Sequence, residues 1–408
     1  MKALKLSWMV IWLYCAAASP FARADAVLDW NEIALSSVVA SKQPAPNTTR
    51  GMAMVQVAIF DAVNLTDPRF LPYAAKSRPV PGASSEAAAA AASRAVLLKL
   101  FPEQRDTIDK AYAAAMASIA ESAEKAAGMA LGEQAAADLL KAREGDGIGA
   151  PNTYRPRTAA GVYVATPLPI GSDFAVSRPW VLARPDEFRP VPPPDLSSQT
   201  WVRDYNEIRS IGGKSSTRRT AEQTAIAQFW VITGAPAFNP IVRYFASTKL
   251  ERPVDRARLF ALAYLAAADS LVAVFDAKYA YNFWRPITAI RNGDLGGNAD
   301  TPPDPSWLPL IDTPLHPEYP CAHCINAGAV GAVLEKLFPS ADLTGFTMSS
   351  PTAPGTTRSW ERLSDLVEEV SNARVWSGVH YRNSTQVGTR MGKQIGERTV
   401  ERFLTRNS

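Results

Sequence analysis

The residues of this chain that are best suited to chemistry lie close together in its last third. All three histidines of the 408-residue sequence fall within 65 residues, and three cationic side chains accompany them in the patterns K-x6-R-P and R-x5-H. The set is Lys278, Arg285, His316, His323, Arg374 and His380. Arginine and lysine bind oxyanions, and a nearby histidine can transfer a proton or bind a metal. The pattern therefore predicts a site for a tetrahedral oxyanion, namely phosphate or vanadate.

The segments that carry these residues indicate how each would be positioned. Nearly two helical turns separate Lys278 from Arg285, so both side chains share one face if the helix continues to Pro286. At residues 320–323, P-C-A-H, a Pro-rich loop turns into a predicted helix, whose free N–H groups favour anions. His323 can exchange a proton there, or it can simply cap the helix or pack in the core. Taken singly, each segment is a weak signal.

The order of the segments is more informative than any one of them. K-x6-R-P, then P-x-x-H, then R-x5-H resembles the three-part motif shared by vanadium-dependent haloperoxidases and the acid phosphatase/type 2 phosphatidic acid phosphatase superfamily. Residues 50–55, 60–64, 219–224 and 229–230 are similar to the exported haloperoxidase-like branch, so the resemblance covers most of the chain after residue 24. It implies a pair of helical bundles with the site in the second.

The resemblance also implies a role for each site residue. Lys278, Arg285 and Arg374 would hold the equatorial oxygens of vanadate. His323 would be the acid/base residue, and His380 would be the axial vanadium ligand, which in the phosphatases is the nucleophile. The cofactor would thus be vanadate, or phosphate if the protein is a phosphatase.

Some positions next to the motifs depart from the family pattern. Cys321 and Ala322 stand where the family usually has Ser and Gly, which bond the oxyanion through a hydroxyl and a backbone N–H. Because a thiol donates hydrogen bonds more weakly than a hydroxyl, Cys321 should weaken oxyanion binding. Ala373 replaces the usual Ser before the third-motif arginine. Ser384 replaces the Asp that commonly follows the last histidine by four, which leaves His380 without an identified orienting partner.

The activity that the resemblance implies is oxidation of bromide or iodide by hydrogen peroxide to hypohalous acid, which halogenates an unidentified organic acceptor. His323 would take a proton from the peroxide, and Lys278 would polarise it. His316 lies seven residues before His323 and resembles the bromide type of enzyme, with a surface or loop histidine as the alternative interpretation. Two other functions remain open: a phosphomonoester hydrolase that forms a phosphohistidine on His380, and a non-catalytic binder of phosphate or vanadate.

Cys321 and Cys324 also form a C-x-x-C pair at the start of a predicted helix. Exported thiol oxidoreductases use this pattern, but they place it in a βαβ unit, whereas this sequence supplies helices. A local disulfide and two resting thiols both remain open. No disulfide framework is expected to hold the fold together.

The first 24 residues have the features of a signal peptide. Lys2 and Lys5 precede a short apolar run, and residues 22–24, A-R-A, form an A-x-A cleavage site. We therefore expect an exported, periplasmic or secreted protein. Removing three basic residues and no acid lowers the formal charge from +4 to +1, which indicates no nucleic-acid or membrane-surface role. We expect no later membrane span, and a homo-oligomer remains open.

Periodicity predicts an all-α fold with a long Pro-rich connector. A capping box at residues 220–223 precedes one of the helices. The predicted helices are 29–39, 51–63, 84–101, 103–120, 122–144, 224–232, 254–283, 325–338 and 385–403. Ten prolines in residues 151–194 disfavour regular structure there. The expected organisation is a signal peptide (1–24), an N-terminal helical region (25–150), a Pro-rich connector (151–205) and a C-terminal helical bundle that carries the site (206–408).

Overall fold

The protein is built almost entirely of packed α-helices. The computed structural model describes residues 25–165, 167–340 and 342–407, so the predicted signal peptide lies outside the described residues. Within these ranges there are thirteen α-helices, three short 3-10 helices and one two-stranded antiparallel sheet. The predicted all-α fold is therefore confirmed.

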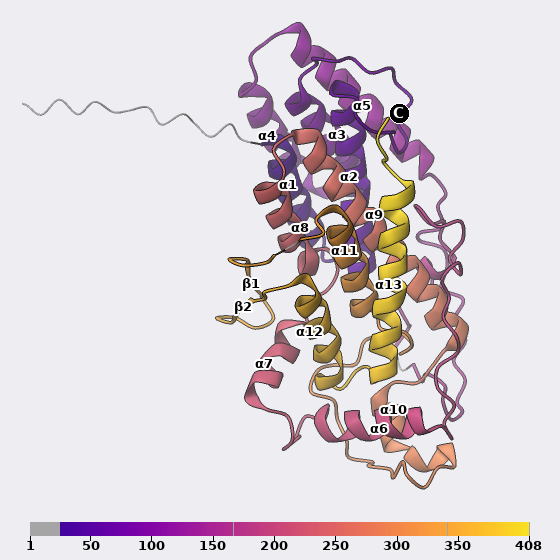
Figure 1. The fold of residues 1–408 in the computed structure, drawn as a ribbon. Helices are drawn as coiled ribbons and strands as arrows, with labels where there is room; N and C mark the ends of the chain where they lie inside the picture. The colour runs from indigo at the N-terminus through magenta and orange to yellow at the C-terminus, as the bar shows by residue number, and fades with distance from the viewer. Residues whose placement is uncertain (1–24, 166, 341, 408) are drawn as a thin grey trace, which may run out of the picture.

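Five helices form the N-terminal part of the molecule, at the upper end in Figure 1. They are α1 (Ala26–Ala40), α2 (Ala45–Thr66), α3 (Ser85–Leu100), α4 (Arg105–Ala117) and α5 (Ala123–Ala142). The side chains of Ser84 and Ser122 cap α3 and α5 by accepting hydrogen bonds from backbone N–H groups in the first turn. Small residues let α5 approach α3 closely, since a Cβ added at Gly132 would lie 2.3 Å from the Ala88 carbonyl oxygen.

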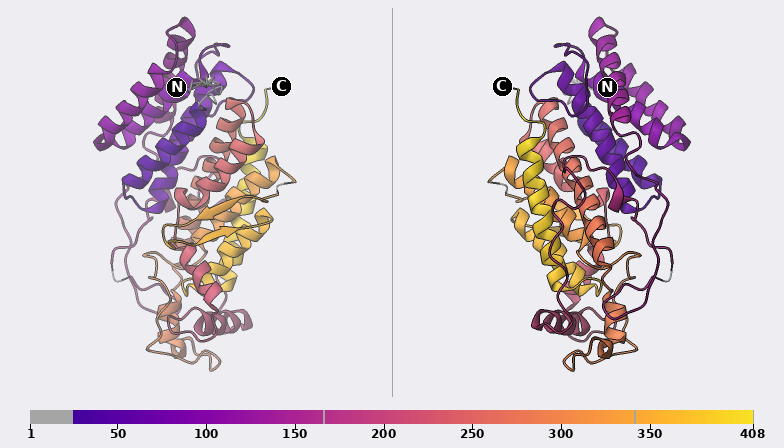
Figure 2. Two further views of the ribbon diagram at one scale, coloured as in Figure 1. Left: turned by 90° about the vertical axis from the view of Figure 1, so that its left-hand side faces the viewer. Right: turned by 90° about the vertical axis from the view of Figure 1, so that its right-hand side faces the viewer.

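Eight helices form the C-terminal part. They are α6 (Gln199–Ile211), α7 (Ala221–Phe229), α8 (Ala235–Lys249), α9 (Pro253–Tyr281), α10 (Pro286–Arg291), α11 (Ala322–Leu337), α12 (Leu363–Trp376) and α13 (Arg382–Arg402). α11 and α13 run side by side, because a Cβ at Gly392 would lie only 2.0 Å from the Ile325 carbonyl oxygen (Figures 1 and 2). The predicted capping box at the start of α7 is present.

α9 is the central helix and contacts both parts, with α2 on the N-terminal side and α11 and α13 on the C-terminal side. Contrary to the sequence-based expectation, it is long and apolar enough to cross a membrane. Yet 94% of its most apolar 18-residue window is buried inside the protein. Its apolar surface is covered by other helices all round, which is typical of a core helix.

A long segment joins α5 to α6 and follows one side of the molecule (Figures 1 and 2). Its described residues contain one short 3-10 helix, η2 (Phe174–Val176). The buried Asp269 carboxylate of α9 fixes the segment by accepting hydrogen bonds at 2.7–2.8 Å from the backbone N–H groups of Trp180, Val181 and Leu182. The Asp269 carboxylate therefore holds this part of the proline-rich connector in place, although the backbone there forms no regular helix or strand.

Several elements differ from the sequence-based expectation. α6 begins at Gln199, inside the predicted connector, because Ser198 caps it by accepting a hydrogen bond from the Trp201 N–H. α8 contains Pro240, although proline is unfavourable inside a helix. α10, α12 and the hairpin of β1 (Thr347–Ser349) and β2 (Thr357–Ser359) were also outside the prediction.

Candidate oxyanion-binding site

The six cationic and histidine side chains predicted from the sequence converge from separate segments. Lys278 lies in the last turn of α9, Arg285 precedes α10, His316 lies in the loop before α11, His323 in the first turn of α11, Arg374 in the last turn of α12 and His380 in the loop before α13. α9 ends at Tyr281, and Asn282 adopts the left-handed conformation with φ of 49°. The helix does not continue to Pro286, so the condition for Lys278 and Arg285 to share a helix face is not met; the chain turns, and both side chains reach the loop around His316.

Arg285 lies at the centre of this group and is fully buried. Its Nε donates to the His316 carbonyl oxygen at 2.9 Å, and its Nη1 donates to the Val379 carbonyl oxygen at 2.8 Å. The same guanidinium lies 3.3 Å from His380 Nε2 and 3.0 Å from His316 Nδ1. Because the guanidinium is rigid and planar, these contacts fix the two histidines relative to each other.

Lys278 holds the loop that carries His316. Its buried Nζ donates to the carbonyl oxygens of Pro317 at 2.9 Å and Glu318 at 2.8 Å. Burial, and then the neighbouring Arg285, lower the pKa of Lys278 well below its usual range. A buried ammonium costs free energy unless negative charge offsets it, so this position favours an anion nearby.

His380 has a partner that the sequence did not reveal. Its Nδ1 lies 2.8 Å from Oε1 of Glu318, which also accepts a hydrogen bond from the Tyr381 N–H at 3.1 Å. Both side chains are buried. Burial raises the pKa of Glu318 to about 7, although the neighbouring cations act in the opposite direction. Glu318 thus takes the orienting role for which the sequence showed only Ser384.

These contacts favour one tautomer of His380. An Nδ1–H that donates to Glu318 leaves the Nε2 lone pair directed away from the carboxylate, toward Arg285. Burial, followed by Arg285 and Lys278, lowers the pKa of His380 well below 6.5, so the imidazole is neutral at pH 7. A neutral imidazole can bind a metal centre or attack phosphorus through Nε2 once that atom exchanges its contact with Arg285 for the ligand.

His323 and Arg374 each have a buried side-chain nitrogen without a hydrogen-bond partner among the described residues. His323 Nε2 and Arg374 Nε make no hydrogen bond to any residue that the structure describes. The rest of each side chain is held in place, because Arg374 Nη1 donates to the Trp230 carbonyl oxygen at 2.9 Å and His323 bonds to the Ile232 backbone. An unsatisfied buried polar group costs roughly 1–3 kcal/mol. An oxyanion that accepts a hydrogen bond from Arg374 Nε and donates its own O–H to His323 Nε2 would remove that cost.

His316 belongs to the same buried group. Its ring contacts Phe275 edge to face, with centroids 5.3 Å apart, and its Nδ1 lies 3.1 Å from the Pro317 carbonyl oxygen. Burial and the adjacent cations lower the pKa of His316 well below 6.5. The surface-histidine interpretation is therefore wrong, since His316 is a buried neutral imidazole.

Cys321 and Cys324 form a disulfide at the N-terminus of α11, which decides between the two states left open by the sequence. Cys321 Sγ accepts a hydrogen bond from the Cys324 N–H at 3.1 Å and so caps the helix. The expectation that the Cys321 side chain faces the oxyanion is not met in the described structure. Ala322 and His323, the next two residues, do line the cavity.

These side chains surround one end of a cavity of about 240 Å3. We call this end the polar end; it is formed by His316, Ala322, His323, Arg374 and His380. The rest of the wall is mainly apolar. Lys278 and Arg285 contact the polar end from behind, through loop carbonyls and the two histidines, rather than lining the cavity themselves.

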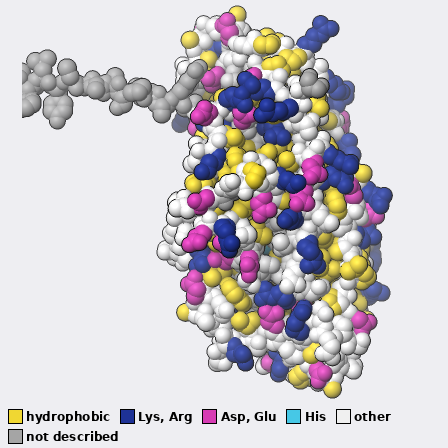
Figure 3. Space-filling model, in the orientation of Figure 1, with side chains coloured by type: hydrophobic (Ala, Val, Ile, Leu, Met, Phe, Trp, Pro, Cys, Tyr) yellow, Lys and Arg dark blue, Asp and Glu magenta, His cyan; other side chains and the backbone are white. Residues whose placement is uncertain are grey.

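The polar end is strongly positive. Within the described part of the chain, the carboxylate that contacts this group is Glu318, and it pairs with His380 rather than with a cation. Burial lowers the pKa of Arg285 to about 10, and burial together with Arg285 lowers that of Arg374 to about 9, so both stay charged at pH 7. On the face drawn in Figure 3, by contrast, acidic and basic side chains are interspersed.

This donor set fits a tetrahedral oxyanion such as vanadate or phosphate. Arg374 Nε can donate to an anion oxygen, His323 Nε2 can accept from a protonated one, and His380 Nε2 can bond a central metal or phosphorus. Among the described residues, no three His, Cys, Asp or Glu side chains cluster as ligands for a bare metal cation.

Known proteins share this site-bearing region. Residues 258–407 match the family model of the VCPO second helical-bundle domain. This part of the chain is similar to that domain. It contains Glu318 and all six of the cationic and histidine side chains. The chain is also 30% identical over 186 residues to vanadium chloroperoxidase from Curvularia inaequalis, a match that covers 38% of this chain and 30% of that protein. It therefore spans less than a third of that relative's length.

Solved structures extend the likeness to the whole fold of the haloperoxidase-like chain. The crystal structure described as the first bacterial vanadium-dependent iodoperoxidase superposes with a TM-score of 0.78 at 21% identity, covering 93% of this chain and 98% of that one. An apo-type bacterial vanadium-dependent chloroperoxidase superposes with a TM-score of 0.69 at 18% identity, covering 86% and 91%. The haloperoxidase-like character predicted from the three motifs is confirmed.

Proposed function

We propose that the protein is a vanadate-dependent haloperoxidase that oxidises bromide or iodide with hydrogen peroxide. The observation that carries the proposal is the positive end of the cavity, where the unpaired Arg374 Nε and His323 Nε2 accompany a neutral His380. In the overall reaction, hydrogen peroxide, a halide ion and one proton give hypohalous acid and water. Vanadate supplies, when bound, the Lewis-acidic centre that makes peroxide able to pass oxygen to a halide.

Five side chains would bind and orient the oxyanion. Arg374 would donate to it from the cavity wall, and His380 would hold it through Nε2. Glu318 keeps the Nδ1–H of His380 in place and so fixes the direction of Nε2. Lys278 and Arg285 offset the negative charge from behind the polar end.

His323 would move the proton. Burial, and then Arg374, lower its pKa well below 6.5, so at pH 7 its Nε2 is a neutral base that can accept a proton from hydrogen peroxide. Negative charge beside the ring raises the pKa of an imidazole. A bound oxyanion would therefore help His323 to hold that proton until water leaves.

His316 would favour bromide and iodide over chloride. Its neutral ring lines the cavity and packs on Phe275, so it can contact a halide at the polar end. One of the solved relatives is an iodoperoxidase, which supports an easily oxidised halide.

A phosphomonoester hydrolase is the second candidate. The Glu318–His380 pair favours it, because a nucleophile and its orienting group have this arrangement. His380 Nε2 would form a phosphohistidine, and His323 would protonate the leaving group. A non-catalytic oxyanion binder would use the same cations without turnover.

Assays of the purified, vanadate-free protein separate these functions. We expect bromide oxidation by hydrogen peroxide only after vanadate is added, and none in the His380→Ala variant. Hydrolysis of p-nitrophenyl phosphate that vanadate inhibits would instead show the phosphatase. Binding of vanadate without turnover of either substrate would contradict both enzymes.

We also propose that the protein is exported by means of residues 1–24. The Cys321–Cys324 disulfide supports this, because disulfides persist in oxidising compartments. Protein recovered from outside the cytoplasm should begin near Asp25 on N-terminal sequencing, and a retained Met1 would contradict the proposal.

A further inference from the structure

The part of the cavity beyond the polar end is apolar and is assembled from distant parts of the chain. Its wall includes Ala45, Ile170, Phe238, Leu271, Phe275 and Leu315. They come from the start of α2, the connector, α8, α9 and the loop before His316. We propose that this apolar part binds the organic acceptor as one small neutral aromatic molecule, next to the oxyanion. The inference rests on the proposed function, because the acceptor is halogenated only if hypohalous acid is formed there.

The size of the cavity limits what can enter. Pockets for drug-sized ligands have volumes of about 300–1,000 Å3. A dry apolar cavity of about 150 Å3 is already enough for one benzene. The volume of about 240 Å3 also includes the polar end. What remains beside an oxyanion therefore suits a single substituted ring or a compact bicycle such as indole, and it excludes larger acceptors.

Phe275 is a fixed aromatic wall beside the site. Its ring lies 5.3 Å from that of His316 and 6.1 Å from that of Phe174, centroid to centroid. On the connector side, a Cβ added at Gly171 would lie 2.4 Å from this ring, so only glycine allows the backbone to approach so closely. A ring held on both sides offers a preformed edge or face to an aromatic ligand.

The connector closes this part of the cavity. The Ile170 N–H donates to the Leu315 carbonyl oxygen at 2.9 Å, and the Asn152 side chain donates to the Pro169 carbonyl oxygen at 2.6 Å. The first bond joins the connector directly to the residue before His316. Long segments without regular structure are usually functional, and here the segment forms a wall of the cavity.

Charge favours a neutral acceptor. Asp312 lies on the exposed part of the wall and adds a negative charge on that side of the cavity. An anionic acceptor would also compete with the oxyanion for Arg374. A neutral aromatic ring gains from burial against Leu271 and Phe275 without losing ionic hydration.

The halogenation step is balanced without a further reagent. A ring carbon of the acceptor bonds to the halogen of hypohalous acid, whose O–halogen bond breaks. The same carbon loses its proton, which leaves with hydroxide as water. Holding the ring next to the site where hypohalous acid forms would shorten the path of this reactive product.

Indole is a suitable probe, and two connector positions provide matched variants. Ile170→Trp fills the apolar part of the cavity, whereas Leu168→Trp adds the same side chain two residues away, where Leu168 is 67% exposed and is not among the described residues that line the cavity. We expect the wild-type protein to bind one indole per chain by isothermal titration calorimetry. Ile170→Trp should weaken binding at least tenfold, and Leu168→Trp should leave it within twofold. Leu315→Trp, at the half-exposed rim, provides a second obstruction that should act like Ile170→Trp.

Two controls complete the test. All variants should keep the wild-type vanadate affinity and, without acceptor, the wild-type rate of triiodide formation from iodide. Iodination of indole should fall at least tenfold in Ile170→Trp alone of the two connector variants. Equal indole binding or iodination in both connector variants would overturn the proposal. Indole binding lost in Ile170→Trp, in a protein that forms no triiodide, would support the binding site while contradicting the peroxidase.

Discussion

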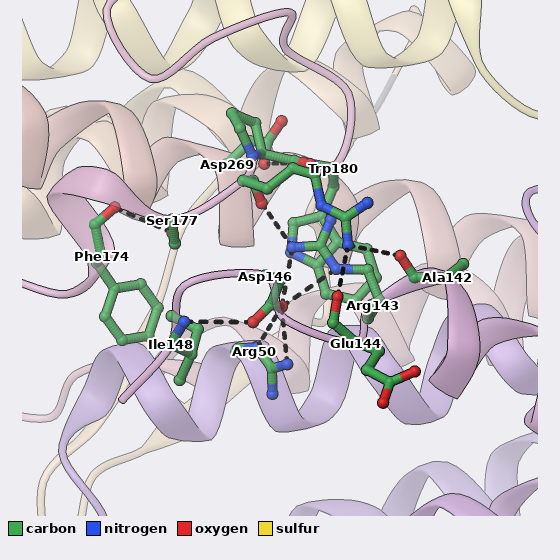
Figure 4. A network of polar contacts seen from close by, with 12 residues as sticks. Arg50, Ala142, Arg143, Glu144, Asp146, Ile148, Phe174, Ser177, Trp180 and Asp269 are labelled. Atoms are coloured by element: carbon green, nitrogen blue, oxygen red, sulfur yellow. Dashed lines mark hydrogen bonds and ion pairs between the residues drawn. The ribbon is translucent and has the colours of Figure 1, made fainter. Parts of the chain in front are cut away.

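Two buried clusters of charged side chains differ in how fully their charges are paired. The first joins α2, the end of α5 and the connector (Figure 4). Asp146 accepts hydrogen bonds from Arg50 at 2.8 Å and Arg143 at 3.0 Å, and the Arg143 guanidinium lies 4.2 Å from the centre of the Trp180 ring. Burial alone would raise the pKa of Asp146, but the two arginines hold it below its usual value.

The second cluster is the candidate site, where positive charge exceeds negative charge. Its carboxylate, Glu318, pairs with a histidine, and burial raises the pKa of that carboxylate to about 7. Arg374 Nε and His323 Nε2 remain without a partner among the described residues. The paired cluster around Asp146 therefore stabilises the fold, whereas the cluster around Arg374 and His323 keeps unpaired polar atoms that an anion can bind. Each prediction below perturbs one of the two clusters.

The largest effect should come from the paired cluster. Arg143→Met leaves Asp146 short of one cation, and breaking a buried pair costs about 3–5 kcal/mol. We expect that loss in the free energy of unfolding measured with urea, with unchanged vanadate affinity. Arg184→Met is the control, because Arg184 is 70% exposed in its pair with Asp186 and should cost less than about 1 kcal/mol. Equal losses of unfolding free energy in Arg143→Met and Arg184→Met would show that the buried cluster stabilises the fold no more than an exposed ion pair does.

Glu318→Gln should change how stability depends on pH. The folded-state pKa of Glu318 is raised from 4.5 to about 7, so its stabilising protonated form is fully present below 4.5 and is lost as the pH rises to about 7. At about 1.4 kcal/mol per pKa unit, the variant should gain about 3 kcal/mol over the wild type across this range. Urea unfolding at pH 4.5, 5.5 and 7 measures the free energy of unfolding of both proteins. If it changes equally with pH in the wild type and in Glu318→Gln, the prediction is wrong.

The same variant tests Glu318 as the positioning residue of His380. Glu318→Gln should lower the kcat of bromide oxidation, because a neutral amide holds the Nδ1–H of His380 less firmly. Adding Ser384→Asp places a carboxylate at the position where the family commonly has one and should restore part of kcat. If the double variant is no better than Glu318→Gln, the orienting role is wrong.

Arg374→Met should weaken vanadate binding at least tenfold. A hydrogen bond to a charged group contributes about 1.5–3 kcal/mol, and Arg374 Nε has no competing partner among the described residues. The free energy of unfolding should change by less than about 1 kcal/mol, since no buried carboxylate loses its cation. Vanadate titrations of the wild type and of Arg374→Met measure the change. If the variant binds vanadate as tightly as the wild type, the anion does not bind next to Arg374.

His316→Phe should have the smallest effect. We expect the ratio of bromide to chloride oxidation to fall a few-fold, because a neutral imidazole that can contact the halide becomes a ring without polar atoms. Vanadate affinity should stay within a few-fold of the wild type. Identical halide ratios would show that His316 has no part in halide selection.

Much of the fold was predictable because helical periodicity, caps and prolines are local signals. Thr220 caps α7 as expected, and Ser84 and Ser122 cap α3 and α5 at the predicted starts of those helices. α8 was missed because Pro240 argues against a helix, whereas buried neighbours such as Phe238 and Ile241 stabilise it. The local sequence pattern does not show that these residues are buried against other helices.

The site was predictable in part for a similar reason. Histidines are few here, so their spacing from Arg374 and Arg285 stood out. Glu318 was missed because it is one acid among many, and its partner His380 is 62 residues away. The shared helix face considered for Lys278 and Arg285 is absent because Asn282, a residue type that can end a helix in the left-handed conformation, ends α9 before Arg285.

A crystal structure of the wild-type protein with vanadate tests the central claim most directly. We predict one oxyanion per chain at the polar end of the cavity, bonded through vanadium to His380 Nε2 and within hydrogen-bond distance of Arg374 Nε. His323 Nε2, without a partner among the described residues, should also contact it. Vanadate bound elsewhere, or a cavity that stays free of it at saturating concentration, would contradict the account.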